Sequence, residues 1–185
     1  MKILDKKNKI YLLDEENFNF PTLDMMKDDL VAVGGDFHPQ RLLNAYENGI
    51  FPWYIDEYNY IHWFSPQKRM IIKPEEMKVS KSLKKSVLNK GFVIKSNENF
   101  EAVMRNCSNI KRKHEDSTWI SEEFIQAYTD LHHLDIAFSI ECYLDEELVG
   151  GLYGLLIGDV FCGESMFAKV TDASKVAFYH LCQQA

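Results

Sequence analysis

Residues 161–167, Phe-Cys-Gly-Glu-Ser-Met-Phe, bring together side chains from which a reaction centre could be built. Glu164 offers a carboxylate and Ser165 a hydroxyl, and large apolar residues stand on either side of this pair. The segment follows a run typical of a strand, so we expect the polar pair at a strand end. It lacks the Gly-x-Ser-x-Gly spacing of a serine hydrolase. From the residues alone, a structural ion pair at Glu164 inside a packed core is an equally good interpretation.

Other common catalytic and metal-binding patterns are absent from the sequence. There is no P-loop and no Gly-x-Gly-x-x-Gly, and none of the six histidines has His-x-x-x-His spacing. Adjacent His132 and His133 are expected near a helix end rather than as ligands. The cysteines are too widely spaced for a zinc knuckle or a dense disulfide framework, so we expect free thiols that are mostly buried: Cys107, Cys142, Cys162 and Cys182.

Three glycines fall inside a run that predicts a strand, namely Gly150, Gly151 and Gly154. Glycine within a strand indicates a bulge or the close approach of a ligand or another backbone. Packing of the protein alone would also explain them. Both interpretations stay open at this point.

Caps, breakers and periodicity predict the elements that position these residues. Helices are expected over 39–48, about 80–89, about 100–107 and after Ser121, and a last helix begins at Ala173 with Asp172 as its cap. Strands are expected over 92–95, 137–143, 147–157 and 159–163, with a tight turn at Gly158-Asp159. The aromatic residues between 50 and 64 predict either a small core or a stacking surface. The pattern indicates an α+β fold with a mixed sheet.

Length and composition allow a real hydrophobic core. The chain has 185 residues, of which 46% are hydrophobic, enough for one domain or two small ones. Composition changes from acidic and aromatic to basic around Ser65-Pro66, which predicts domains over 1–66 and 67–185. No run approaches the roughly 18 apolar residues of a membrane span, and the start lacks the apolar block of a signal peptide. We therefore expect a cytoplasmic protein with no membrane partner.

Charge is unevenly distributed along the chain. The net charge is -7, yet residues 68–113 contain 13 Lys and Arg against 4 Asp and Glu. A basic face on an otherwise acidic protein could hold a phosphate backbone, while the acidic remainder could attract a basic partner. On charge alone, a solvated lysine-rich surface is the simpler interpretation.

A series of short motifs resembles the leucyl/phenylalanyl-tRNA-protein transferase family. They run in the family's order from residue 34 to residue 175, which makes chance agreement very unlikely. The resemblance implies a small N-terminal domain and a GNAT-like acyltransferase domain. The motifs are Gly34-Gly35-Asp36, Arg41-Leu42-Leu43-x-Ala45-Tyr46, Gly49-Ile50-Phe51-Pro52-Trp53, Trp63-x-Ser65-Pro66, Thr118-Trp119-Ile120, Leu148-Val149-Gly150-Gly151-x-Tyr153-Gly154, residues 161–167 and Ala173-Ser174-Lys175.

The resemblance also implies a reaction and its partners. Such enzymes move Leu, Phe or sometimes Met from aminoacyl-tRNA to the α-amine of proteins that begin with Arg or Lys, and this N-end rule signal marks them for degradation in bacteria. An α-amine titrates near about 7.7 to 8.0 and the ester is activated, so the enzyme mainly aligns the reactants and stabilises oxyanion charge. We therefore expect Leu-tRNA and Phe-tRNA as partners, no cofactor, and a monomer.

Site residues are carried over from the family motif by motif. The pocket for the aminoacyl side chain must exclude β-branched residues by shape, since one methylene changes binding by only about 1 to 3 kcal/mol. Trp53 and Trp119 match aromatic positions around the terminal adenosine and the acceptor. The expected catalytic residue is Glu164; the substrate-binding residues are Tyr46, Trp53, Trp119, Leu152, Phe161, Ser165, Met166 and Leu181, with Phe178 as an alternative to Leu181; the tRNA-contacting residues are Lys81, Lys84 and Lys85.

The resemblance stops at the last predicted helix. Family members continue into a strand with an Asp-x-Gln motif that is thought to activate the amine, and then into further strands, whereas this sequence ends at Ala185. We therefore expect the C-terminal strands to be missing and the 185-residue form to transfer little. One alternative is a tRNA-binding fragment without catalysis. A CoA-dependent N-acetyltransferase is disfavoured, because residues 168–173 lack the glycine turn that holds a pyrophosphate.

Overall fold

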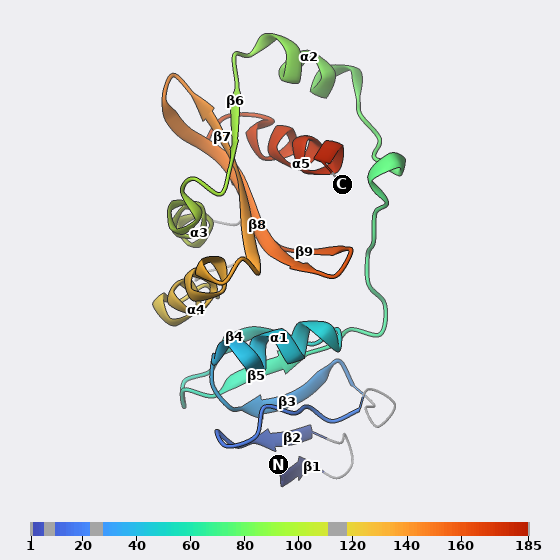
Figure 1. Cartoon of the computed structure of the whole chain (residues 1–185), viewed down its shortest axis with the longest axis vertical. Coiled ribbons are helices and arrows are strands. Elements are labelled where there is room, and N and C mark those ends of the chain that lie inside the picture. Colours follow the sequence, from blue (N-terminus) through green and yellow to red (C-terminus); the bar gives the residue numbers. More distant parts are fainter. Residues whose placement is uncertain (1, 6–9, 23–27, 111–117, 185) are drawn as a thin grey trace. The chain divides into compact units, whose positions relative to one another are not determined.

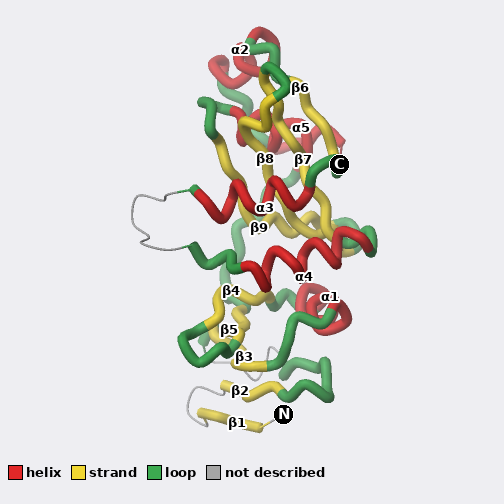
Figure 2. The backbone as a smooth tube through the Cα atoms, turned by 90° about the vertical axis from the view of Figure 1, so that its left-hand side faces the viewer, coloured by secondary structure: helices red, strands yellow, loops and turns green. Residues whose placement is uncertain are grey.

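The computed structural model describes residues 2–5, 10–22, 28–110 and 118–184. The chain divides into two units, Met1–Met70 and Ile71–Ala185. Each unit combines a sheet with one or more helices (Figures 1 and 2), which confirms the expected α+β class. In the part of the chain that is described, no helix has the length and apolar character needed to cross a membrane.

The first unit contains a five-stranded mixed sheet and one helix. Helix α1 (Pro39–Glu47) packs against β4. Pro39 begins the helix and Gly49 follows its end with a φ of 69°, as predicted. The strands stand in the order β1-β2-β3-β5-β4, with β2 and β3 parallel and the other pairs antiparallel. They are β1 (Lys2–Asp5), β2 (Ile10–Leu13), β3 (Leu30–Gly34), β4 (Phe51–Ile55) and β5 (Ile61–Phe64).

The aromatic-rich segment forms the hairpin of β4 and β5. Trp63 is fully buried and its Nε1 donates to the Gly34 carbonyl at 2.8 Å. Trp53, in contrast, is 47% exposed, and its ring lies edge-on to Phe64 with the ring centroids 5.0 Å apart. The sequence left a small core and a stacking surface as alternatives. The hairpin buries Trp63 in a small core and leaves Trp53 exposed, and a stacking role for Trp53 stays a prediction.

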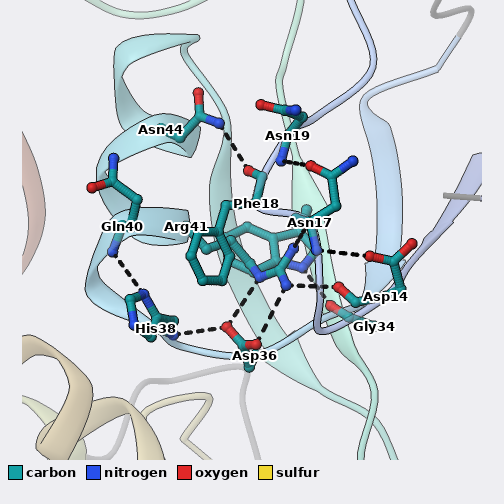
Figure 3. Close-up of polar contacts among 11 residues, drawn as sticks. Asp14, Asn17, Phe18, Asn19, Gly34, Asp36, His38, Gln40, Arg41 and Asn44 are labelled. Atoms are coloured by element: carbon teal, nitrogen blue, oxygen red, sulfur yellow. Dashed lines mark hydrogen bonds and ion pairs between the residues drawn. The ribbon is translucent and has the colours of Figure 1, made fainter.

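A buried arginine joins three segments of the first unit (Figure 3). Arg41 is fully buried, and its Nε and Nη2 donate to the Asp36 carboxylate at 3.1 and 3.3 Å. Its Nη1 donates to the Asn17 carbonyl at 2.9 Å and its Nη2 to the Asp14 carbonyl at 2.7 Å. Gly35 has a φ of 72°, and a Cβ there would stand 3.0 Å from the guanidinium carbon. Glycine is therefore required beside Arg41 for both conformation and space.

The guanidinium also keeps Asp36 charged. Partial burial raises the pKa of Asp36, but hydrogen bonds from Arg41 and from the His38 backbone N–H outweigh it and hold this pKa below its usual value. Because the pKa is lower in the folded chain, the ion pair stabilises the fold above the unfolded-state pKa of Asp36. This stabilisation is lost as the pH falls through the folded-state pKa.

The second unit is a four-stranded antiparallel sheet with helices on both faces. Helix α5 (Ala173–Gln184) packs against β7, β8 and β9 on one face, and α3 (Phe100–Asn109) and α4 (Glu122–His133) cover the other (Figure 1). Helix α2 (Lys81–Asn89) packs against α5 and follows a short 3-10 turn, η2 (Pro74–Glu76). The strand order is β6 (Val93–Ser96), β7 (Ala137–Leu144), β8 (Glu147–Ile157) and β9 (Val160–Ala168).

Local signals located most elements of this unit. The hydroxyl of Ser80 accepts from the Leu83 N–H at 3.1 Å at the start of α2, and Gly91 follows its end with a φ of 71°. Gly158-Asp159 forms the turn between β8 and β9, as predicted. These signals act within a few residues of the element that they end, so the sequence alone contains them.

Two expectations for the second unit were wrong. Strand β9 continues to Ala168, so Glu164 and Ser165 lie within a strand and not at its end. A bulge interrupts the alternation of side chains there, which is why the sequence pattern stopped short. Asp172 stands at the N-cap position of α5, where its carbonyl accepts from the Val176 N–H at 2.8 Å, but its carboxylate does not cap the helix as expected: its φ is 74°, and the carboxylate accepts from Ser86 and Lys175 instead.

Glycines in β8 allow neighbouring elements to approach closely. A Cβ on Gly150 would stand 2.5 Å from the Ala173 Cβ, and one on Gly151 would stand 2.8 Å from the Ile140 carbonyl oxygen. On Gly154 it would stand 2.3 Å from the Cys162 carbonyl oxygen. Packing within the protein therefore accounts for all three glycines.

Removing the Arg41 side chain should destabilise the first unit. We expect Arg41→Ala to lower the free energy of unfolding by about 3 kcal/mol, because a carboxylate and two carbonyls lose their buried donor. Arg41→Lys should recover only part of this loss, since an ammonium lacks the planar fork of donors. Urea unfolding followed by tryptophan fluorescence measures the change. Arg105→Ala is the matched control; Arg105 is an exposed arginine paired with Glu101 and Glu122, and its loss should cost less than about 1 kcal/mol. Equal losses would contradict a special role for Arg41.

Gly154 should not tolerate a side chain, although Gly163 on the opposite strand should. We expect Gly154→Ala to cost about 1 to 3 kcal/mol of unfolding free energy, because the new Cβ overlaps a backbone carbonyl. Gly163→Ala should change it by less than about 0.5 kcal/mol, since its nearest neighbour would be a Phe161 ring carbon at 3.9 Å. Urea unfolding of both variants measures the difference, and a stable Gly154→Ala protein would show that β9 can move away.

Candidate functional site

The segment with the candidate carboxylate lies on β9, next to β8. Ser165 pairs with Tyr153 and Gly163 pairs with Gly154, so Glu164 is the extra residue of a bulge. A bulge changes the direction of the side chain that it carries, and bulges are frequent beside active sites. Glu164 and Ser165 are both half-buried. The strand thus holds a carboxylate and a hydroxyl at an irregular point of an otherwise regular ladder.

An apolar cluster lies between this sheet and α5. Leu152, Ala173 and Ala177 are among its buried members. Met166 pairs directly with Leu152, so both side chains stand on the α5 face of the sheet, and Met166 is 46% exposed. The structure therefore brings most of the predicted pocket residues to one place, with a flexible apolar side chain at its exposed edge. The partly buried members from the prediction are Phe161, Phe178 and Leu181.

The other face of the sheet holds buried polar groups that the sequence analysis missed. Glu141 is fully buried, and its Oε1 accepts from the Ser139 hydroxyl and from the Asn99 backbone N–H. Ser139 and Glu141 are two residues apart in β7, with apolar residues on either side. This Ser-x-Glu spacing within a strand could have indicated that the two side chains share one face. Tyr153 is buried on the same face, where its ring meets Phe100 and Tyr128 edge-on with both centroid distances 5.9 Å.

Three predicted substrate-binding residues lie outside β8, β9 and α5. Trp119 precedes α4, is half-buried and packs edge-on against Phe124 with the centroids 5.4 Å apart. Trp53 and Tyr46 belong to the first unit, where Trp53 is exposed and Tyr46 is only 6% exposed. Their participation in a common site stays a prediction.

The predicted tRNA-contacting lysines share one exposed face of α2. Lys81, Lys84 and Lys85 are exposed, whereas Leu83 and Ser86 on the same helix are buried. Among the residues that the structure describes, these three lysines form no ion pair, whereas three other lysines of the basic stretch do. Lys73 pairs with Glu76, Lys90 with Asp172 and Lys95 with Glu98. The end of the basic stretch, Lys111, Arg112 and Lys113, lies outside the described residues.

The cysteines of the chain are mostly buried. All four cysteines are free thiols, as predicted; three are buried and Cys162 is half-buried. Burial raises the pKa of Cys142 to about 11, so this thiol stays protonated at neutral pH. Over residues 2–5, 10–22, 28–110 and 118–184, no group of three or more His, Cys, Asp or Glu side chains is placed to hold a metal ion.

Two family models match the chain. Residues 71–185 match the model described as leucyl/phenylalanyl-tRNA protein transferase, and residues 35–67 match the model of the N-terminal domain of the same family. The first match alone covers more than half of the chain. Between them, the two matches contain every residue proposed for the site.

Curated relatives agree with the family models. A leucyl/phenylalanyl-tRNA–protein transferase of Sulfurimonas denitrificans is 52% identical over 90% of this chain and 72% of its own length. Its namesake from Dechloromonas aromatica is 50% identical over 88% of this chain and 70% of its own length. Another, from Flavobacterium johnsoniae, is 46% identical over 93% of this chain and 81% of its own. The motif resemblance is thereby confirmed, and the chain belongs to the leucyl/phenylalanyl-tRNA protein transferase family.

Proposed function

We propose that this enzyme transfers an aminoacyl group from tRNA to the N-terminus of an acceptor protein. The relatives' name describes this reaction, and the chain shares about half of its residues with two of them. The observation that carries the proposal is the bulge on β9 at Glu164, in the same strand that contributes Phe161 to the apolar cluster. A polar group beside an apolar recess suits a substrate that has a charged amine and an apolar side chain.

The apolar cluster would receive the side chain of the transferred amino acid. Leu152, Phe161 and Met166 present apolar surface from two strands, and Leu181 and Phe178 close it from α5. Met166 is unbranched and adaptable, so it can adjust to side chains of different length. Shape must exclude β-branched residues, because burial of one methylene discriminates too weakly. Leu and Phe are accordingly the donors that we propose, with Met as a further possibility.

Glu164 would hold the acceptor amine or the ribose of the terminal adenosine. In the reaction, the neutral α-amine attacks the ester carbonyl, the bond to the ribose oxygen breaks, and that oxygen takes up the proton that the amine loses. Peptide bond formation needs no redox change, and the ester is already activated. Alignment and oxyanion stabilisation are then the main contributions of the protein. Ser165, Trp119, Trp53 and Tyr46 are proposed to bind the substrates.

Charge supports the proposed partners. An acidic chain with a net charge of -7 favours acceptors that begin with Arg or Lys, while the lysines of α2 favour the phosphates of Leu-tRNA or Phe-tRNA. We also propose a GNAT-like fold for residues 67–185, a small N-terminal domain over 1–66, a monomer and a cytoplasmic location. A CoA-dependent acetyltransferase stays disfavoured, because residues 168–173, which follow β9, contain no glycine.

Replacing Glu164 should affect transfer more than tRNA binding. We expect Glu164→Ala to slow single-turnover transfer of labelled leucine to an Arg-initiated peptide about a hundredfold, since small misplacements of reactants have effects of this size. Filter binding of Leu-tRNA should change less than about twofold, because Glu164 contributes no attraction to phosphates. Glu147→Ala, at the exposed start of β8, is the control and should leave both unchanged. Equal losses of transfer and binding would count against a reaction-centre role.

The lysines of α2 should contribute to tRNA affinity in a salt-dependent manner. Combined Lys81→Ala, Lys84→Ala and Lys85→Ala substitutions should lower the slope of log affinity against log salt by roughly 2 to 3, since each phosphate contact contributes roughly 0.7 to 0.9. Lys73→Ala and Lys95→Ala are matched controls, because Glu76 and Glu98 already neutralise these lysines. Fluorescence titration of labelled tRNA at several salt concentrations gives the slope. An unchanged slope in the triple variant would show that α2 is an ordinary solvated surface.

A further inference from the structure

We propose that Asp172 is a positioning residue that holds the basic helix α2 against α5, so that tRNA binding on α2 and placement of the aminoacyl group beside α5 are coupled. The inference rests on the proposed function, which assigns phosphates to the lysines of α2 and the aminoacyl side chain to the cluster at α5. Neither role by itself requires that the two helices be joined. The contacts of Asp172 supply the connection.

Asp172 follows β9 in the chain and contacts α2, 86 residues earlier. Its Oδ2 accepts from the Ser86 hydroxyl at 2.8 Å and lies 3.7 Å from the Lys90 ammonium. Lys90 also donates to the neighbouring Thr171 carbonyl at 2.8 Å. Ser86 and Lys90 are four residues apart, so both lie on the same side of α2. One side of α2 thus makes three polar contacts with the loop before α5.

The conformation of Asp172 explains why its carboxylate faces α2. Its φ of 74° lies in the left-handed region, which Asp tolerates better than most residues. In this turn the carboxylate meets Ser86 and Lys175, where an extended residue would cap α5. The hydrogen bond from Ser86, followed by that from Lys175, holds the pKa of Asp172 below its usual value. The group is therefore charged at neutral pH, and charge-assisted hydrogen bonds are the stronger ones.

Helix α2 depends on this contact for its position. It has nine residues, and helices shorter than about 12 to 15 residues are marginal in water on their own. Leu83 and Ser86 are its buried residues, on the side away from the exposed lysines. Leu83 supplies apolar contact, which has no direction, whereas the Ser86 hydrogen bond fixes geometry. Loss of Asp172 should therefore release the lysines from a defined place.

On its other side, Asp172 is directly bonded to the helix that lines the apolar cluster. Ala173 packs against the β8 backbone so closely that a Cβ on Gly150 would stand 2.5 Å from it. Ala173 and Ala177 belong to the cluster, as do Phe178 and Leu181 further along α5. The start of α5 is thus held by the sheet on one side and by α2 on the other. A shift of α2 would therefore also shift the start of α5 and the apolar cluster. Binding of tRNA at α2 and binding of the aminoacyl side chain at the cluster should then strengthen each other, because coupling between two sites is reciprocal.

The test compares two ligands that differ in whether they reach α2. One is Leu-tRNA, and the other is an amide-linked 3'-leucyl-adenosine that lacks the tRNA body. We expect Asp172→Ala and Ser86→Ala each to weaken Leu-tRNA about fivefold or more, with less than about a twofold change for the small analogue. In the Asp172→Ala background, the Lys84→Ala, Lys85→Ala pair should lose most of the effect that it has in the wild type. Fluorescence titration measures both affinities.

Lys175→Ala is the matched control, because Lys175 binds the same carboxylate from within α5 and is 67% exposed on its side chain. It should leave both affinities unchanged.

Equal weakening of the two ligands by Asp172→Ala would overturn the proposal, since Asp172 would then only support the fold. The proposal would also be overturned if Asp172→Ala weakened neither ligand. The same holds if the Lys84→Ala, Lys85→Ala pair had its full effect in the Asp172→Ala background. If Asp172→Ala does not fold, Ser86→Ala decides, because it removes a single hydroxyl. Lysine variants without effect in the wild type would instead refute the function proposed for α2.

Discussion

Two consecutive glycines in β8 allow helices to press on both faces of the sheet of the second unit. Neighbouring residues of a strand point to opposite faces, so Gly150 opens one face and Gly151 the other. The first space is occupied by Ala173 of α5, and the second by the ring of Phe167 and a methyl group of Val103 from α3. The apolar cluster, the course of β9 and the start of α5 all follow from this close packing. A sheet with side chains at both positions would hold its helices further away.

This sheet separates two environments. Its α5 face is apolar and ends in the partly exposed Met166, whereas its other face buries Glu141 with the hydroxyl of Ser139. Strand β9 lies at the edge of the sheet, and its bulge carries Glu164. Among the described strands, β8 is the neighbour with which the irregular part of β9 pairs.

The sequence predicted best what depends on near neighbours in the chain. The caps and stops at Ser80, Gly49 and Gly91 are made by atoms within one helical turn, and their positions were confirmed. The extent of β9 and the role of Asp172 depend on strands and helices far away in sequence, so local patterns misjudged both. Arg41 belonged to a recognised motif, yet its carbonyl partners lie 24 and 27 residues earlier. For the site, the motifs named Leu152, Phe161, Phe178 and Leu181, which the structure brings into one cluster, whereas no spacing rule brings residues from two strands and a helix together.

The partners of Arg41 also set the order in which the first unit can form during synthesis. A chain leaves the ribosome from its N-terminus, so the carbonyls of Asp14 and Asn17 emerge before the arginine that binds them. The Phe18 carbonyl likewise emerges before Asn44, whose side-chain amide donates to it at 2.8 Å. Strand β3 in turn pairs with β5, which is made last. The carbonyls of Asp14 and Asn17 therefore stay hydrated until Arg41 has emerged, and β3 lacks its partner β5 until residue 64 has been made.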